Sequence, residues 1–173
     1  MPTPPSASPA AAADTTLLFS PDYLDLTATD SASFAINIST GRNKITGVQL
    51  EIAYDPKILS IVSLTPGTFF PTPNILLNTI DSETGRISYA LVLQPSQAPL
   101  FGSGTVARLQ LKQNFSGGNL SSQTTLTLLQ KSLVSALGID GSVLRETKSA
   151  TINLPIYSGP QYIGTNSATP SKQ

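Results

Sequence analysis

Apolar and polar positions alternate most clearly in the segment Val48–Tyr54. Every second residue of this segment is apolar: Val48, Leu50, Ile52 and Tyr54. The residues between them are polar or small: Gln49, Glu51 and Ala53. A period of two is typical of a strand that buries one face. Asp55-Pro56 ends the predicted strand, because proline cannot donate a hydrogen bond to a neighbouring strand.

Short segments of the same kind recur along the chain, separated by turns that contain glycine or proline. We predict strands at 15–19, 23–28, 32–39, 48–54, 58–64, 75–80, 86–93, 105–112, 124–129, 143–146 and 150–154. The Asp140-Gly141 turn before 143–146 indicates a hairpin. This pattern predicts an all-β protein, an antiparallel β-sandwich of the jelly-roll type. Immunoglobulin and fibronectin type III sandwiches are alternatives, disfavoured because the chain has no tryptophan for their core.

Two segments depart from simple alternation. Val106 is out of phase with Leu109 and Leu111, and a β-bulge near Ala107 would turn all three side chains inward. The segment Leu129–Leu137 has a leucine at every fourth position and is the one candidate for a helix. It lacks a clear helix cap, and Val134 lies off the leucine stripe. We therefore predict a turn or an extended stretch there.

The two ends of the chain differ in composition from its middle. Residues 1–13 are rich in proline, alanine and serine and are predicted to be a linker, and residues 158–173 are predicted to be a flexible C-terminal linker. One β-sandwich domain is expected over residues 14–157. The start of the sequence lacks the basic and apolar regions of a signal peptide. We therefore expect a fragment or a mature form, a module of a larger chain.

Charge and composition exclude several classes of function. The 173 residues include ten basic and ten acidic ones, and charged residues make up 12%, about half of the usual ~25%. This balance argues against binding to nucleic acid or to an anionic membrane. No apolar run reaches the ~18 residues that cross a bilayer, so no membrane insertion is expected. Cysteine and histidine are absent, which excludes their zinc sites and nucleophilic dyads.

The acidic residues do not predict an active site. Most of the ten lie in turns or at strand ends, and nothing in the sequence brings two carboxylates together in a cleft. We therefore expect no enzyme, no catalytic residue and no cofactor. Asp81 and Glu83 form the densest acidic cluster, for which a structural calcium ion is an alternative to an ordinary turn. We assign no metal ligands.

Aromatic residues give little support for sugar binding, which needs exposed ring faces. Phe34, Tyr54 and Tyr89 fall on the predicted inward faces. Phe69 and Phe70, between Gly67 and Pro71, are the best candidates for a loop-borne contact. The alternative, which we favour, is that these two rings close one end of the sandwich.

Four segments together resemble bacterial cohesin domains and the related carbohydrate-binding modules of the same jelly-roll superfamily. They are Gly47–Leu59 with its Tyr-Asp-Pro element, Leu64–Gly67, Gly85–Ala90 and Gly102–Leu109. The resemblance implies a cohesin-like sandwich that recognises another protein through the outer face of one sheet. In cellulosomes that protein is a dockerin, a small helical module that carries the calcium itself. The resemblance also implies an extracellular or cell-surface location.

The resemblance and the alternation together place the candidate binding face on two strands. Its residues are Gln49, Glu51, Arg86, Ser88 and Ala90, provided that the two strands are neighbours. Type I cohesins that bind dockerins commonly have Asn and Asp where this chain has Gly47 and Gln49. The partner is therefore left open between a dockerin-like module and another protein. A carbohydrate-binding module that takes a polysaccharide and a passive spacer domain of a surface protein are the alternatives.

Overall fold

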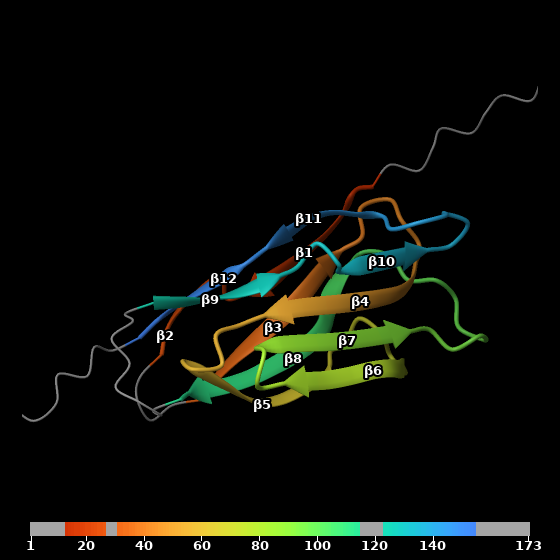
Figure 1. The fold of residues 1–173 in the computed structure, drawn as a ribbon. Coiled ribbons are helices and arrows are strands. Elements are labelled where there is room, and N and C mark those ends of the chain that lie inside the picture. The colour runs from red at the N-terminus through yellow and green to blue at the C-terminus, as the bar shows by residue number, and fades with distance from the viewer. Residues whose placement is uncertain (1–12, 27–30, 115–122, 155–173) are drawn as a thin grey trace, which may run out of the picture.

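The computed structural model describes residues 13–26, 31–114 and 123–154. Two sheets pack face to face, with β4, β7 and β6 in front of β3 and β8 (Figure 1). The first sheet has five strands in the order β11 (Leu144–Lys148), β1 (Thr15–Ser20), β3 (Ser31–Ser39), β8 (Ser103–Gln113) and β5 (Leu59–Pro66). The predicted all-β sandwich is confirmed. The predicted linkers at 1–13 and 158–173 lie outside the described residues, apart from residue 13.

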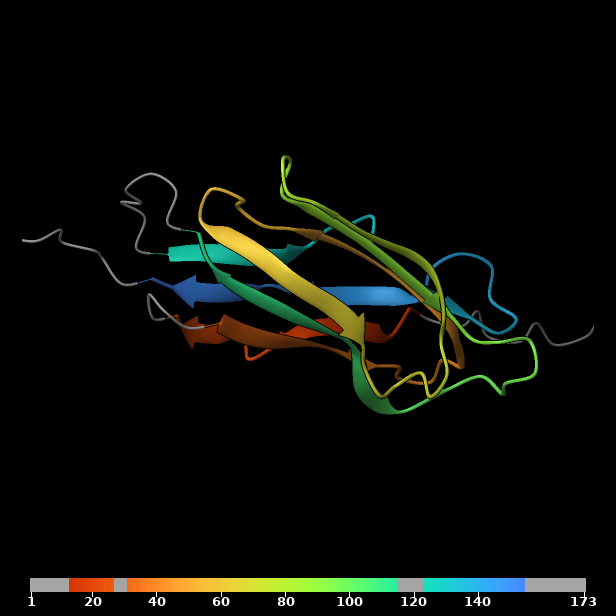
Figure 2. The same ribbon diagram turned by 90° about the horizontal axis from the view of Figure 1, so that it is seen from below.

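The second sheet has seven strands, with β4 near its centre. Its order is β2 (Tyr23–Asp25), β12 (Ala150–Asn153), β9 (Gln123–Leu128), β4 (Ile45–Ala53), β7 (Arg86–Val92) and β6 (Asn74–Asp81), and β10 (Leu133–Ala136) also pairs with β4. Figure 2 shows the two layers from below. The described part of the chain contains no helix long and apolar enough to cross a membrane.

The core lies between the sheets and follows the alternation of the sequence. All four apolar residues of the Val48–Tyr54 segment are buried, and the residues between them are half-buried on the outer face. On β7, Ile87, Tyr89 and Leu91 are fully buried in the same way. The predicted bulge is also confirmed. Ile36 on β3 pairs with Ala107 and the next residue with Thr105, so that Val106 is the extra residue and is itself buried.

The segment Leu129–Leu137 is extended, as predicted. It turns after β9 and re-enters the sheet as β10, antiparallel to the first half of β4, whereas β9 pairs with the last two residues of β4. Val134 is buried, which places Leu133 and Leu137 outside. Ser132 fills the interval between β9 and β10, because its buried hydroxyl accepts a hydrogen bond from the Glu51 N–H at 3.0 Å.

The predicted hairpin at Asp140-Gly141 is wrong. Gly141 does form a turn with a φ of 89°. However, β10 before it belongs to the seven-stranded sheet, and β11 after it joins the five-stranded sheet beside β1. Val143 links the two sheets, since its N–H donates to the Val134 carbonyl at 2.9 Å and its own carbonyl accepts from the Thr15 N–H at 3.2 Å. A turn signal identifies the reversal of the chain but not the strand that pairs next.

The terminal strands pair in parallel, in contrast to the antiparallel pairing predicted for the whole sandwich. β1 runs parallel to β11, and β2 runs parallel to β12. The chain crosses from the five-stranded to the seven-stranded sheet twice. It does so between β1 and β2, after Ser20, and between β11 and β12, at Ser149. The first two and the last two strands of the described chain are therefore joined by parallel pairing in both sheets, which we call the parallel seam.

The hydroxyl of Tyr89 has no hydrogen-bond partner among the described residues, although the side chain is fully buried. Burial raises the pKa of this hydroxyl. An unpaired buried hydroxyl costs about 1 kcal/mol or more, so we expect Tyr89→Phe to raise the free energy of unfolding by about 1 kcal/mol. Denaturation by urea measures the change. A clear loss of stability would contradict this expectation and would show that the hydroxyl has a partner.

Candidate functional site

The predicted binding residues lie together on the outer face of the seven-stranded sheet. β4 and β7 are adjacent and antiparallel, with Gln49 opposite Ala90 and Glu51 opposite Ser88. Figure 1 shows the two strands side by side at the front of the molecule. Arg86 is exposed on the same face, one row further along, opposite Ala53. The condition on which the sequence prediction depended, that the two strands are neighbours, is met.

A hydrogen-bond network fixes the carboxylate of Glu51 at the centre of this face. Gln49 Nε2 donates to Glu51 Oε1 at 2.8 Å, and Ser88 Oγ donates to Glu51 Oε2 at 2.7 Å. Neither of the two ion pairs found among the described residues involves Glu51. The face therefore presents one oriented negative charge supported by neutral donors. Hydrogen bonds to a charged acceptor are stronger than those between neutral groups, so the three side chains hold one arrangement.

Two leucines that sequence reasoning missed extend the central row of the face. Leu133 on β10 lies opposite Gln49, and Leu77 on β6 lies opposite Ala90. They are 45% and 38% exposed, which is high for large apolar side chains. The row across four strands is Leu133, Gln49, Ala90 and Leu77. The buried Val134 is the sequence signal that could have placed Leu133 outward, because neighbouring residues of a strand point to opposite faces.

A hollow adjoins this row at the start of β4. Its volume is about 560 Å³, and its lining is mainly apolar: Thr46, Gly47, Val92, Leu93, Gln94, Pro95, Gln97, Pro99, Ser135 and Leu137. Gly47 contributes no side chain to this space. A Cβ atom added there would lie 3.1 Å from Val92 Cγ1 and 3.2 Å from the Leu91 carbonyl oxygen. The hollow therefore depends on a residue without a side chain at position 47.

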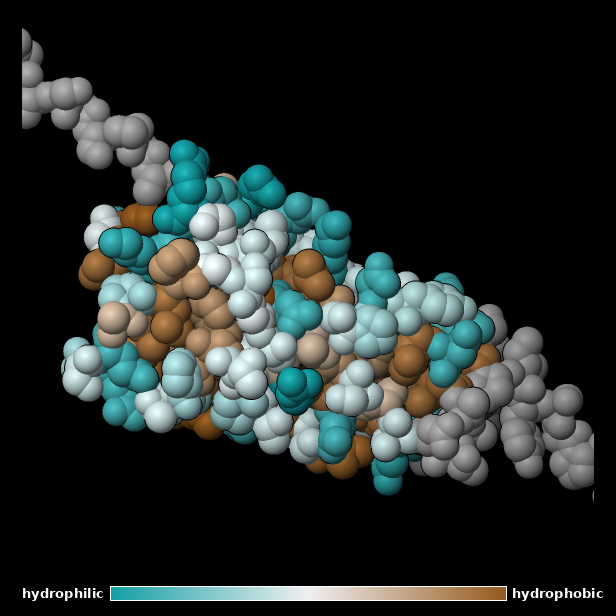
Figure 3. Space-filling view, turned by 180° about the vertical axis from the view of Figure 1, so that it is seen from behind, coloured by the Kyte–Doolittle hydropathy of each residue, from teal (hydrophilic) through white to brown (hydrophobic). Residues whose placement is uncertain are grey.

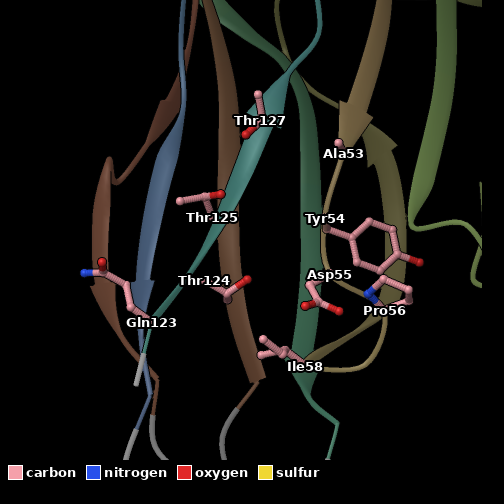
Figure 4. A pocket seen from close by; sticks show the side chains of 9 residues that line it. All are labelled: Ala53, Tyr54, Asp55, Pro56, Ile58, Gln123, Thr124, Thr125 and Thr127. Atoms are coloured by element: carbon pink, nitrogen blue, oxygen red, sulfur yellow. The ribbon is translucent and has the colours of Figure 1, made fainter. Parts of the chain in front are cut away.

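A second hollow, of about 580 Å³, opens at the other end of β4. β4 and β9 pair only up to Ala53 and Thr127 and then diverge. Figure 4 shows Thr124 and Asp55 on the two sides of this space, while the ring of Tyr54 points away from it. Its lining combines polar side chains with the apolar Ala53, Pro56 and Ile58, and Glu51 is not part of it.

Phe69 and Phe70 are not surface contacts in this structure. They are only 8% and 1% exposed, and their rings meet edge to face with centroids 5.2 Å apart. Gly104 lies directly under the first ring, since a Cβ there would be 3.1 Å from Phe69 Cδ2. The candidate loop contact at these two residues therefore does not fit the structure, whereas the alternative of a packed closure does.

The Asp81–Glu83 cluster is a turn in this structure. Asp81 accepts hydrogen bonds from the backbone N–H groups of Glu83 and Thr84 and from the Thr84 hydroxyl at 2.6 Å. These bonds, led by that from the hydroxyl, lower the pKa of Asp81. In residues 13–26, 31–114 and 123–154, no three acidic side chains gather in a way that could hold a metal ion.

The outer face of the five-stranded sheet has a different distribution of exposed side chains. Figure 3 looks at the molecule from that side and shows teal and white side chains over most of the surface, with brown ones in separate groups. The exposed residues of β8, which lies between the central strand β3 and the edge strand β5, include Arg108, Gln110 and Lys112. Among the described residues of its strands, Val62 is the one large apolar side chain that is exposed, so this face has no counterpart of the row with two exposed leucines.

Comparison with known families gives a match to the family described as the Cohesin domain over residues 11–154, most of the chain. The chain belongs to the cohesin family. Cohesin domains are non-catalytic modules that recognise other proteins, so the expectation of a binding module without enzymatic activity is confirmed. A search of the curated proteins finds no significant match.

Solved cohesin structures share the fold at low sequence identity. The cohesin of the Coh-OlpC–Doc435 complex from Clostridium thermocellum aligns with a TM-score of 0.68 and 16% identity, over 86% of this chain and 97% of that one. A type II cohesin from the cellulosome of Acetivibrio cellulolyticus gives a TM-score of 0.66 and 16% identity over 80% and 95% of the two chains. A non-cellulosomal cohesin from the archaeon Archaeoglobus fulgidus gives 0.62 and 13% over 82% and 91%.

Proposed function

We propose that this cohesin domain binds a dockerin-like protein module through the outer face of β10, β4, β7 and β6. The observation that supports the proposal best is the fixed carboxylate of Glu51, held by Gln49 and Ser88, beside a row that ends in two exposed leucines. Binding energy at protein interfaces concentrates in a few central contacts, which the rim shields from water. A central charge flanked by apolar anchors fits that description.

Gly47 and its hollow indicate the chemistry of the contact at one end of this face. Position 47 itself has no side chain, and the lining of the hollow is mainly apolar, with Val92 and Leu137 beside the polar Ser135. An apolar side chain of the partner fills such a space better than a hydroxyl does, because a buried hydroxyl without a partner loses its hydrogen bonds to water. We therefore expect a partner that differs from those of cohesins with Asn and Asp at positions 47 and 49.

The location of the protein follows from the same proposal. Dockerin complexes of the cohesins from Clostridium thermocellum and Acetivibrio cellulolyticus have been crystallised, and one relative is described as cellulosomal and another as non-cellulosomal. We place this domain in an extracellular or cell-surface assembly, with the partner supplying any calcium. The balanced charge of the chain leaves affinity to local contacts rather than to long-range attraction.

The test is capture of the partner from the secreted proteins of the source organism on the immobilised chain, with calcium and with EDTA. We expect a small helical protein that is retained in calcium and released by EDTA. Retention of the chain on cellulose, chitin or xylan, without such a protein, would contradict the proposal and favour a carbohydrate-binding module. If neither is bound, the domain is a spacer.

Substitution of the central residues should separate this face from the rest of the surface. We expect Glu51→Ala to weaken binding of the captured partner at least tenfold, about 1.4 kcal/mol, because both the charge and its network are lost. The matched control is a pair of glutamines: Gln49→Ala should weaken binding, and Gln110→Ala on the outer face of β8 should not. Calorimetric titration measures all three. Equal effects of the two glutamine substitutions would place the site elsewhere.

A further inference from the structure

The edge strand β6 combines a free strand edge with an unusual set of exposed apolar side chains. β6 pairs with β7 on one side, and none of the described strands pairs with its other side. All residues from Asn74 to Ile80 are exposed. The large apolar ones are exposed by 37% to 61%: Ile75, Leu76, Leu77 and Ile80. A long edge strand of this kind offers unpaired backbone groups to another strand, and natural proteins commonly protect such edges with lysine or proline.

The apolar residues of β6 cover both faces of the strand. Ile75 lies opposite Leu91 and Ile80 opposite Ile87, on the face towards the core, whereas Leu77 lies opposite Ala90 on the outer face. A bulge inserts Leu76 between them, and Leu76 is the most exposed residue of the set. β5 and β6 end the two sheets on the same side of the sandwich (Figure 1). A strand added to β6 would therefore bury apolar surface on both of its faces.

We propose that β6 is a self-association edge, on which a second copy of this chain pairs its own β6 in the antiparallel direction. A two-fold axis requires that the segment be compatible with itself. Residues 74–80 carry no charge, so two copies meet without repulsion between like charges. With the axis at Asn78 and Leu76 left unpaired as the bulge residue of each copy, Ile75 of each copy faces Ile80 of the other, both on the face towards the core. The acid that follows, Asp81, then faces the amide of Asn74.

The other sheet edges fit a second copy less well. β2 has three residues, and β11 has five, of which Arg145, Glu146 and Lys148 are charged. β5 is as long as β6, but Val62 is its one large apolar residue that is exposed. β6 therefore combines length, absence of charge and apolar residues on both faces. Pairing through β6 would join two seven-stranded sheets into one and set the two Glu51 faces side by side. The inference does not depend on what those faces bind.

Sedimentation velocity of the full chain from about 1 µM to about 1 mM tests the proposal. We expect the apparent mass to rise from that of the 18.1 kDa monomer towards twice that value. Leu76→Lys places a charge on the edge and should raise the dissociation constant of the dimer at least tenfold. Leu137→Lys is the matched control, because Leu137 is 59% exposed and Leu76 is 61% exposed. Leu137 follows β10, which pairs with β4 on the side away from β7 and β6. It should leave the dimer unchanged.

Circular dichroism and thermal unfolding establish that both variants are folded. Amide hydrogen exchange of the unsubstituted chain gives a second readout, since protection of residues 74–81 should rise with concentration if β6 pairs. A chain that stays monomeric at 1 mM would overturn the proposal and leave the edge to a strand of another protein. Equal loss of association in the two leucine variants, or protection elsewhere than on β6, would also overturn it.

Discussion

Replacing Gly85 by alanine is expected to lower the free energy of unfolding by about 3 kcal/mol. Gly85 has a φ of 68°, a conformation that costs a residue with a side chain about 1–2 kcal/mol. A Cβ atom there would also lie 2.2 Å from the carbonyl oxygen of Tyr54, so the backbone would have to move. That movement would strain the hydrogen bond from the Tyr54 N–H to the Gly85 carbonyl, which measures 3.0 Å.

Gly138→Ala is the matched control for this prediction. Gly138 has a similar φ of 72°, but nothing lies within 4 Å of the Cβ position. It should therefore show only the conformational cost, about 1–2 kcal/mol. Urea denaturation of both variants gives the two free energies. Equal losses of unfolding free energy would contradict the prediction. They would mean that the backbone near Gly85 and Tyr54 can move to accept a Cβ atom without loss of stability.

The second large effect is expected at Leu50, which is fully buried at the centre of β4. Leu50→Ala should lower the free energy of unfolding by about 3 kcal/mol, since it removes buried apolar atoms and leaves a cavity. Gln49→Ala, at the adjacent position on the outer face, should change stability by only about 0.5 kcal/mol. Urea denaturation compares them. A large loss of stability in the Gln49 variant would mean that this side chain serves the fold rather than binding.

The alternation in the sequence predicted which residues share a face. On β4 it separated the buried Leu50 and Ile52 from Gln49 and Glu51, and on β8 the phase error at Val106 correctly indicated a bulge. It could not indicate which strands are neighbours. That β4 and β7 lie side by side was a condition of the prediction, which the structure meets, and the hairpin at Asp140-Gly141 failed because the turn leads into the other sheet.

The missed residues have physical reasons as well. The bulge at Leu76 changes the phase of β6, so a strict period of two does not show that Leu77 belongs to the outer face. Leu133 appeared to belong to a helical stripe until the pairing of β10 with β4 fixed its direction. Phe69 and Phe70 lie in a loop, which has no regular pattern of apolar residues. Phe69 packs on Gly104, which is distant in the sequence. Periodicity carries no information on such contacts.

The parallel seam of the terminal strands determines how the domain responds to mechanical force. β1 and β2 run alongside β11 and β12 in the same direction, and the described chain enters at the start of β1 and leaves at the end of β12 (Figure 1). A pull on the two ends therefore slides β1 and β2 along β11 and β12 in opposite directions. The backbone hydrogen bonds of the seam share this load and must break together, rather than one after another. This arrangement favours resistance to a pull on the two ends of the described chain.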